Sequence, residues 1–234
     1  MRLLYAVKGR KGAAILTGEI GCGKTLLSRV LLRNLLDKRF EVILIANPFL
    51  PPVSFLKEIL FQMGITNNFK QKVSILHAIN NKLLENVKKE RETILIIDEA
   101  HLIIDDRHVM EEIRLLLNFQ LDNRFLLTLI LIGQPELKYG ISKMPQLEQR
   151  IAIKYHLKPL NRSETERYIH FRLKTAGLTR NIFTDKAVDK ICEYSQGIPR
   201  KINNISDLSL LIAYSKKEKI VNSNIVLESI NEQT

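Results

Sequence analysis

Short apolar runs alternate with amphipathic stretches over the first two-thirds of the chain. The apolar runs contain few polar positions, which is typical of strands buried on both faces. They occupy residues 13–17, 41–46, 93–98, 126–132 and 151–157. Between them apolar residues recur at intervals of three and four, as on one face of a helix. Strands that alternate with helices predict an α/β fold, in which helices cover both faces of a parallel five-stranded sheet.

Beyond residue 158 the pattern changes to helices alone. Ser163 and Glu166 have the spacing of a capping box and predict the start of a helix, which Gly177 would end. Further helices are expected at 185–195, at 199–215 and from Ser223 onward. The sequence therefore predicts two domains, an α/β domain over residues 1–158 and a small all-helical domain over residues 159–234.

Residues 18–25 read Gly-Glu-Ile-Gly-Cys-Gly-Lys-Thr, a full match to the phosphate-binding P-loop pattern. Glycine has no Cβ, so the backbone can turn its N–H groups around an anion. Lys24 is expected to reach the β- and γ-phosphates, and Thr25 to hold Mg²⁺ through its hydroxyl. The expected nucleotide-binding residues are Gly18, Glu19, Ile20, Gly21, Cys22, Gly23, Lys24, Thr25 and Leu26.

The segments on either side of the loop support this interpretation. An apolar run precedes it, and a helix with its free N–H groups and dipole facing the phosphates is expected after it. The expected fold is thus a P-loop NTPase with three αβα layers. The apolar positions expected on one face of the helix are Leu26, Leu27, Val30, Leu31, Leu35 and Leu36.

A second motif closes the apolar run at 93–98, where Asp98 and Glu99 follow each other. Two adjacent carboxylates at the end of a buried strand are costly unless a ligand needs them. Downstream of a P-loop, Asp98 is expected to belong to the Mg²⁺ shell and Glu99 to polarise the attacking water. His101 completes an Asp-Glu-Ala-His tetrad and is expected to be a local polar contact rather than a base.

Composition adds limits to the class of protein. The 234 residues are 45% apolar, enough for a sizeable core. The sequence contains no run of about 18 apolar residues, so no transmembrane helix is predicted. The first residues do not have the pattern of a signal peptide. The cysteines are Cys22 and Cys192, and Cys22 lies inside the P-loop, so a reducing cytoplasmic location is expected.

The net charge of +11 raises the question of a polyanionic partner. Arg2, Lys8, Arg10 and Lys11 open the chain without an intervening acid. This balance favours either a phosphate-rich partner such as DNA or an anionic membrane surface. A solvated basic surface with no such partner is the alternative, since no groove-reading or aromatic-interleaved motif appears.

Three further segments of the sequence are similar to segments of a known family. They are Leu-Ile-Gly-Gln-Pro-Glu-Leu at 131–137, Gln-Leu-Glu-Gln-Arg-Ile at 146–151 and Gly-Ile-Pro-Arg-Lys-Ile-Asn-Asn at 197–204. With the two motifs above, the chain resembles AAA+ ATPases, and within them the ExeA-type (general secretion pathway protein A) group and its TniB- and MuB-like transposition relatives. The resemblance implies a helical lid, a polar sensor at Gln134, a trans-acting arginine at Arg150 and a phosphate-sensing lid arginine at Arg200.

Local chemistry agrees with two of these implied roles. Gln134 leaves its expected strand toward the carboxyl edge, where ligands bind in open α/β sheets. Arg200 and Lys201 directly follow Pro199 in the first turn of an expected helix, where cations oppose the helix dipole, and this suggests an anionic ligand nearby. ExeA-type proteins often carry a segment that packs over the adenine, a membrane span and a peptidoglycan-binding region. None is recognisable here, so the adenine pocket is expected to be incomplete or the chain to be an excised module.

Two functions are compatible with these observations. The first is Mg²⁺-dependent ATP hydrolysis at the subunit interfaces of a homo-oligomer, serving secretion or cell-envelope assembly. The catalytic residues would be Glu99, Gln134, Arg150 and Arg200, and the cofactors ATP and Mg²⁺. The second is an ATP-dependent DNA-binding adaptor of a transposition system, in which hydrolysis is slow or regulatory. Glu99 favours the first function, and the basic balance favours the second.

Overall fold

The computed structural model describes residues 2–67, 69–122 and 124–233. The chain divides into two compact units. The first comprises Met1–Gly18 and Lys24–Leu157, and the second comprises Glu19–Gly23 and Lys158–Thr234. The middle of the P-loop segment is thus grouped with the C-terminal helices.

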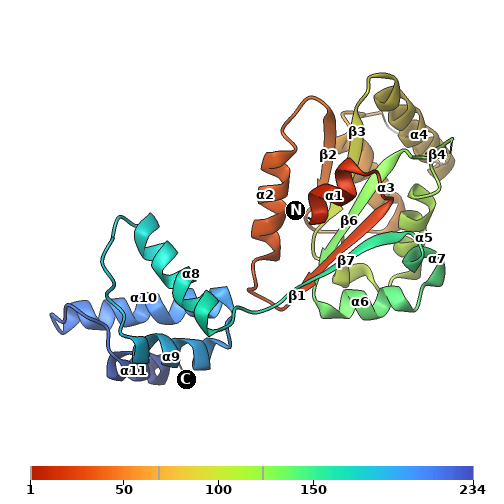
Figure 1. Ribbon diagram of the computed structural model, residues 1–234. Coiled ribbons are helices and arrows are strands. Elements are labelled where there is room, and N and C mark those ends of the chain that lie inside the picture. The colour runs from red at the N-terminus through yellow and green to blue at the C-terminus, as the bar shows by residue number, and fades with distance from the viewer. Residues whose placement is uncertain (1, 68, 123, 234) are drawn as a thin grey trace. The chain divides into compact units, whose positions relative to one another are not determined.

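A five-stranded parallel sheet forms the centre of the first unit (Figure 1). Its strands lie in the order β2-β3-β6-β1-β7, as the apolar runs predicted in number and direction. Their bounds are β1 (Ala13–Gly18), β2 (Phe40–Ile45), β3 (Glu92–Ile97), β6 (Leu127–Gly133) and β7 (Ile151–Leu157). Every residue of β1 and β6 is buried, because both strands are covered by neighbouring strands and by both helical layers.

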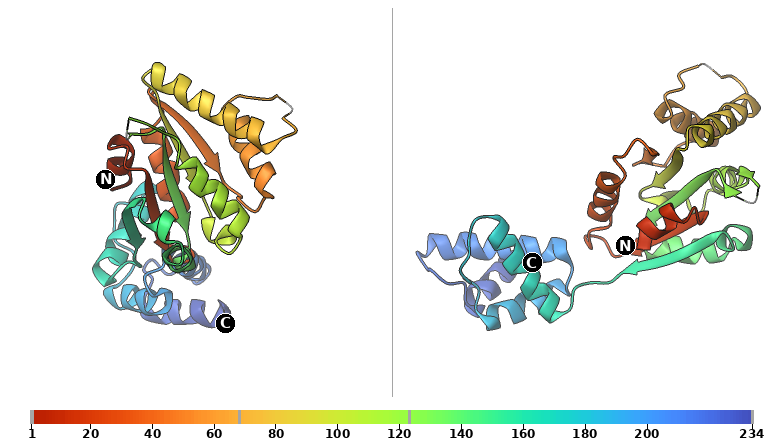
Figure 2. Two further views of the ribbon diagram at one scale, coloured as in Figure 1. Left: turned by 90° about the vertical axis from the view of Figure 1, so that its right-hand side faces the viewer. Right: turned by 45° about the horizontal axis from the view of Figure 1, so that its top comes forward.

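Helices cover both faces of the sheet, and alternate residues of each strand face opposite layers (Figures 1 and 2). Leu95 and Ile97 pack with one layer, whereas Ile94 and Ile96 pack with the other. The first layer holds α3 (Pro52–Gln62), α4 (Lys72–Lys88), the 3₁₀ helix η1 (Ala100–Ile103), α5 (Arg107–Leu116), α6 (Pro135–Ser142) and α7 (Pro145–Glu148). The second holds α1 (Arg2–Lys8) and α2 (Lys24–Asn34). The three-layer αβα expectation is confirmed.

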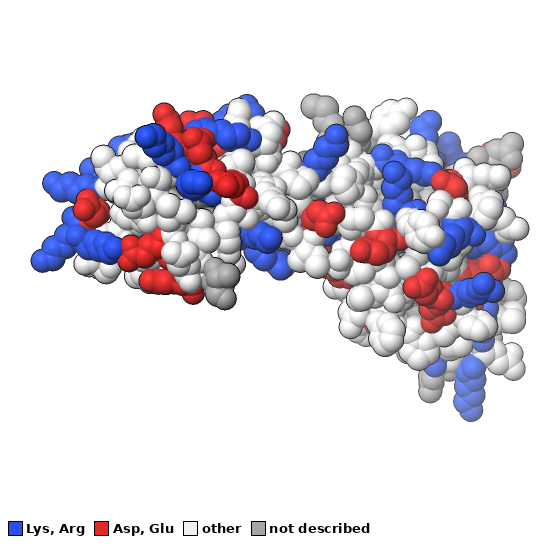
Figure 3. All heavy atoms as spheres, turned by 90° about the horizontal axis from the view of Figure 1, so that it is seen from below, with Lys and Arg blue, Asp and Glu red and all other residues white. Residues whose placement is uncertain are grey.

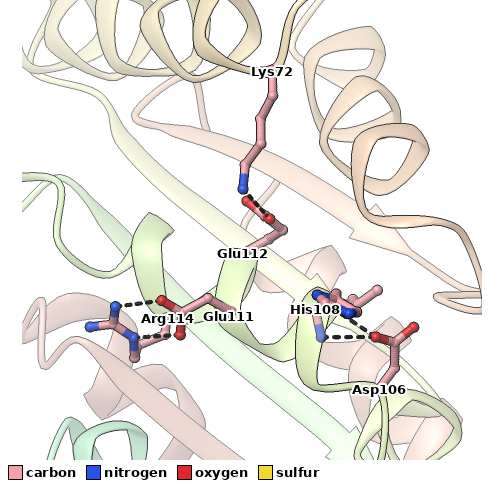
Figure 4. A network of polar contacts seen from close by, with 7 residues as sticks. Lys72, Asp106, His108, Glu111, Glu112 and Arg114 are labelled. Carbon is pink, nitrogen blue, oxygen red and sulfur yellow. Dashed lines mark hydrogen bonds and ion pairs between the residues drawn. The ribbon is translucent and has the colours of Figure 1, made fainter.

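Contacts between charged side chains join the helices of the first layer (Figure 4). Lys72 at the start of α4 forms an ion pair with the buried Glu112 of α5, with 2.5 Å between Nζ and Oε1. Asp106 caps α5 by accepting from the backbone N–H groups of His108 and Val109. The first contact joins α5 to α4, and the second satisfies backbone donors at the start of α5.

The apolar face expected for α2 is wrong in part. Leu31 and Leu35 are buried, but Leu26 is 65% exposed, and Leu27, Val30 and Leu36 are also exposed. The buried line consists of Lys24, Ser28 and Leu31 of the helix and continues to Leu35 just after its end, at spacings of four, three and four residues. Two polar residues begin that line, so a search for apolar residues alone selects a neighbouring face.

Several short elements of the first unit, η1 among them, have no counterpart among the expected ones. The helix α1 precedes β1, and a short antiparallel hairpin joins β4 (Gln120–Leu121) to β5 (Arg124–Phe125). Both are too short to produce a clear periodic pattern in the sequence.

The second unit contains the helices α8 (Arg162–Thr175), α9 (Asp185–Ser195), α10 (Pro199–Ser215) and α11 (Ser223–Gln233). Their apolar faces share one core, which includes Ile169, Ile191 and Ile205. The expected capping box of Ser163 and Glu166 is wrong. Asn161 and Glu164 form the box instead, because the helix begins one residue before Ser163. Among the described helices, none is long and apolar enough to cross a membrane.

Candidate nucleotide-binding site

The P-loop segment lies directly between β1 and α2, and its glycines have the backbone geometry that only glycine adopts freely. Gly21 has φ of +84° and Gly23 has φ of +99°. At Gly18, a Cβ would lie 2.8 Å from the carbonyl oxygen of Leu157 on the neighbouring strand β7. The three glycines are therefore required by the turn and by the close approach of two strands.

Lys24 opens α2 and is only 7% exposed. Its ammonium group donates a hydrogen bond to the carbonyl oxygen of Gly18 at 2.8 Å. A buried ammonium group beside the N–H groups of a helix N-terminus makes a positive site suited to phosphate oxygens. Thr25 follows as an exposed residue, so its hydroxyl is accessible from solvent.

Asp98 and Glu99 follow β3 at the carboxyl edge of the same sheet. Asp98 is 6% exposed, and its Oδ1 accepts from the backbone N–H of Glu99 at 2.9 Å. Glu99 has φ of 51° and ψ of 33°, a left-handed conformation that costs a non-glycine residue about 1 kcal/mol or more. Its side chain is 41% exposed. Asp98 is thus fixed in place, whereas the Glu99 carboxylate remains accessible to water.

Gln134 follows β6, the strand between β1 and β3. Because the three strands are parallel neighbours, the P-loop, Gln134 and the Asp98–Glu99 pair follow the same edge of the sheet. The Gln134 amide nitrogen lies 2.7 Å from Nε2 of His101. Nδ1 of His101 lies 3.3 Å from Oε2 of Glu99. Sequence reasoning expected a local polar contact for His101, and the tetrad could not show that it links two separate strand ends.

Arg150 lies at the amino ends of the strands, whereas the P-loop lies at their carboxyl ends. It precedes β7, whose first residue pairs with Ala13, the first residue of β1. The P-loop follows the last residue of β1, a strand length of roughly 20 Å away. The Arg150 guanidinium donates to the carbonyl oxygen of Leu117 at 2.6 Å. Arg150 is therefore not brought to the phosphate loop of its own chain.

Arg200 belongs to the second unit, where it lies in the first turn of α10. The N-cap residue of this helix, Ile198, offers no side-chain cap, and no acid lies in the first turn. Within the same unit, the Arg200 backbone N–H donates to the Gly21 carbonyl oxygen at 3.2 Å. Arg200 and Lys201 are both exposed. The two cations at this helix start therefore lack the acidic partners that the helix dipole favours there.

Thr25 and Asp98 carry the hard oxygen donors that Mg²⁺ prefers. Among the described residues, no three side chains of His, Cys, Asp or Glu gather as a metal site. Mg²⁺ is usually held by one or two protein oxygens together with waters and substrate phosphates rather than by a complete protein cage. One hydroxyl and one buried carboxylate fit that mode of binding.

An apolar groove of about 430 Å³ runs between α1, α2 and the end of β7. Its walls include Leu4 of α1, Leu27 and Val30 of α2, and Tyr155 and Leu157 of β7. The groove was not predictable from the sequence, because α1 was not expected and the exposed apolar residues of α2 were expected to be buried.

Comparisons with known proteins agree with this fold. Residues 7–139 match a family model described as an AAA domain. The chain therefore belongs to the AAA domain family.

Two curated proteins are similar to the chain. It is 37% identical over 230 residues to general secretion pathway protein A of Aeromonas hydrophila, covering 96% of this chain and 41% of that protein. It is 29% identical over 180 residues to an uncharacterised HTH-type transcriptional regulator of Methanocaldococcus jannaschii, covering 70% of this chain and 42% of that protein. The chain thus spans about two-fifths of the length of these relatives.

Solved structures show the same fold at low sequence identity. The Aeropyrum pernix ORC2 protein, in its ADPNP–ADP complexes, has a TM-score of 0.69 at 17% identity, covering 99% of this chain and 65% of that one. The Thermotoga maritima RuvB Holliday junction branch migration motor has a TM-score of 0.63 at 17% identity, covering 98% and 66%. At this level of identity the likeness shows the fold alone.

Proposed function

We propose that the protein is an ATPase that hydrolyses ATP with Mg²⁺ at the carboxyl edge of its sheet. One observation carries this proposal. The P-loop, the Asp98–Glu99 pair and Gln134 follow three adjacent parallel strands in the order β1, β3 and β6 along the chain. Membership of the AAA domain family supports adenine as the base.

Each residue at this edge has a role that its chemistry allows. Lys24 and the glycine backbone would bind the β- and γ-phosphates, and Thr25 and Asp98 would hold Mg²⁺, which neutralises phosphate charge. Glu99 would accept a proton from the attacking water, because its carboxylate is exposed while Asp98 is buried. Gln134 would donate a hydrogen bond to that water or to the terminal phosphate.

Arg150 and Arg200 do not follow any of these three strand ends, and we propose a role for each. We infer that Arg150 serves the site of a neighbouring subunit as an arginine finger, since it lies at the opposite edge of its own sheet. Arg200 would sense phosphate, a role supported by two cations in a helix turn without acidic partners. The role of Arg150 requires a homo-oligomer, whereas Arg200 already contacts Gly21 of the P-loop through its backbone.

A role in secretion or cell-envelope assembly is supported by the 37% identity to general secretion pathway protein A. The chain spans 41% of that relative, so the partner contacts of the longer protein are proposed only for the part that is shared. Within the described chain, Cys22 and Cys192 are not in a disulfide. We propose a cytoplasmic location because Cys22 lies inside the P-loop, where a structural disulfide is unsuitable.

A DNA-binding adaptor is the second candidate, and the net charge of +11 favours it. The Aeropyrum pernix ORC1 structure, which shares the fold at a TM-score of 0.68, is a complex with DNA. On the face seen in Figure 3, however, basic and acidic side chains are interspersed. This arrangement supports a broad, salt-sensitive attraction to DNA rather than one strong basic groove.

The test is the steady-state ATPase rate as a function of protein concentration, with and without duplex DNA. A rate per subunit that rises with concentration, and that Lys24→Ala abolishes, supports hydrolysis between subunits. No Mg²⁺-dependent turnover at any concentration contradicts the ATPase proposal. DNA retention that depends on ATP and falls with salt would favour the adaptor, and retention insensitive to both would reject it.

A further inference from the structure

His101 connects two residues of the candidate site that come from different strands. It lies in η1, with its side chain only 14% exposed. Its Nε2 lies 2.7 Å from the amide nitrogen of Gln134, and its Nδ1 lies 3.3 Å from Oε2 of Glu99. The imidazole thus has one polar neighbour at each ring nitrogen, and each neighbour is a proposed catalytic residue.

The chemistry of these contacts fixes where the imidazole proton lies. An amide nitrogen can only donate, so Nε2 of His101 must accept the hydrogen bond from Gln134. A neutral imidazole that accepts at Nε2 carries its proton on Nδ1. Nδ1 lies 3.3 Å from Oε2 of Glu99 but makes no hydrogen bond within the described chain. The Gln134 amide therefore holds the ring by a hydrogen bond, and the ring places its Nδ1–H group next to the Glu99 carboxylate.

Two features of the local backbone place His101 close to Gln134 and Glu99. A Cβ at Gly133 would lie 3.1 Å from the backbone nitrogen of His101, so the missing side chain lets η1 approach the end of β6. On the other side, Glu99 holds the left-handed conformation directly before η1, which turns the chain sharply after β3. The close approach at Gly133 and the left-handed backbone of Glu99 thus bring His101 between two strand ends.

We propose that His101 is a positioning residue that couples the orientation of Gln134 to that of Glu99. The Gln134 amide has two N–H groups, and His101 accepts from one of them, which leaves the other to donate to a phosphate oxygen or water. Oε2 of Glu99 likewise lies next to His101, which leaves Oε1 available to a water molecule. A contact made by Gln134 is thereby transmitted to the proposed base. This inference rests on the proposed ATPase function.

The kinetic test uses variants that remove one contact at a time. His101→Asn keeps a polar atom near the Nδ1 position and loses the contact to Gln134. His101→Gln keeps one near the Nε2 position and loses the contact to Glu99. His101→Phe keeps the ring and loses both. The matched control is His108→Phe, an exposed histidine whose side chain takes part in none of the contacts found in the described chain.

We expect His101→Phe to lower kcat by about tenfold or more, with the dissociation constant for ATP changed by less than about twofold. The double variant His101→Phe/Gln134→Ala should then be no slower than the slower single variant, because both changes break the same link. The control should keep the wild-type kcat. Losses that multiply in the double variant, or a His101→Phe enzyme with unchanged kcat, would overturn the proposal.

A second measurement does not depend on activity. Nitrogen-15 NMR of labelled histidine distinguishes the two neutral tautomers of a ring. We expect His101 to be protonated at Nδ1 in the wild-type protein, and Gln134→Ala to shift the ring toward the Nε2-protonated form. An Nε2-protonated His101 in the wild type would refute the link, because Nε2 could not then accept from the amide.

These outcomes separate the inference from the proposed function. A wild-type protein without Mg²⁺-dependent, Lys24-dependent turnover contradicts the ATPase proposal, and the NMR measurement still decides the His101 link. A wild-type protein with normal turnover but with multiplicative variants or the other tautomer contradicts the His101 proposal alone.

Discussion

The ammonium group of Lys24 donates a hydrogen bond to the carbonyl oxygen of Gly18, 2.8 Å away, and so joins the two ends of the P-loop. The hydrogen bond links the last residue of β1 to the first residue of α2. A positive charge is held between the strand end and the helix start, where the backbone N–H groups also converge.

Replacement of Lys24 by alanine should weaken ATP binding. Loss of one charge-assisted contact to phosphate costs about 1.5–3 kcal/mol, which is roughly a 10- to 100-fold loss of affinity. Fluorescent-nucleotide titration measures it, and Lys88→Ala, at an exposed lysine of α4, serves as a surface-lysine control. Unchanged affinity in Lys24→Ala would mean that the loop does not bind the phosphates.

Replacement of Glu99 by glutamine should leave ATP binding intact and lower kcat by about 10²- to 10⁴-fold, the usual contribution of a general base. Glu99→Gly should also lose turnover, but it removes the Cβ that is strained at φ of 51°. It should therefore raise the free energy of unfolding by up to about 1 kcal/mol. A Glu99→Gln enzyme with wild-type turnover would exclude the carboxylate as the base.

Replacement of Arg150 by alanine should lower kcat by about 10³-fold or more if Arg150 acts as an arginine finger. Mixing Arg150→Ala subunits with Glu99→Gln subunits should restore part of the activity, since some interfaces then combine an intact Glu99 with an intact Arg150. Arg124→Ala, an exposed arginine near the same edge, is the control. No recovery at any mixing ratio would argue against a trans contact.

The ion pair between Lys72 and Glu112 should matter for stability and not for chemistry (Figure 4). Glu112 is only 3% exposed, so Lys72→Met would leave a buried carboxylate without its cation, at a cost of about 1–3 kcal/mol. The double variant Lys72→Met/Glu112→Leu should recover most of that loss. Thermal unfolding measures both, and a double variant less stable than Lys72→Met would contradict this account.

Acid should weaken a contact on the same helix. The hydrogen bond from Arg114 lowers the pKa of Glu111 below its ordinary value. A carboxyl whose pKa is lower in the folded state stabilises the protein above its unfolded pKa, and that stabilisation is lost as the pH falls through the folded value. The melting temperature of the Glu111→Gln variant should therefore fall by less than that of the wild type when the pH is lowered from 6 to about 3. Equal losses would show that the pair contributes nothing.

The sequence predicted features that depend on neighbouring residues and missed those that depend on distant partners. The five strands were predictable because residues such as Ile94–Ile97 are apolar on both faces of the strand. The buried line of α2 was not, because Lys24 and Ser28 begin it. The contact of His101 with Gln134 was not predictable either, since it spans 33 positions and only the strand order brings the two residues together.

Arg150 and the P-loop lie at opposite ends of the parallel strands. If Arg150 is the proposed finger, the amino ends of the strands supply it and the carboxyl ends of a neighbouring subunit receive it. Two subunits related by a twofold axis through this contact would then each have to use both ends of the sheet in one interface. A head-to-tail arrangement meets the requirement with one end of each sheet per contact. Such stacking either closes into a ring or continues as a helical filament with one sense of growth. In a filament, the subunit at one end would have no finger from a neighbour, so nucleotide there would persist the longest.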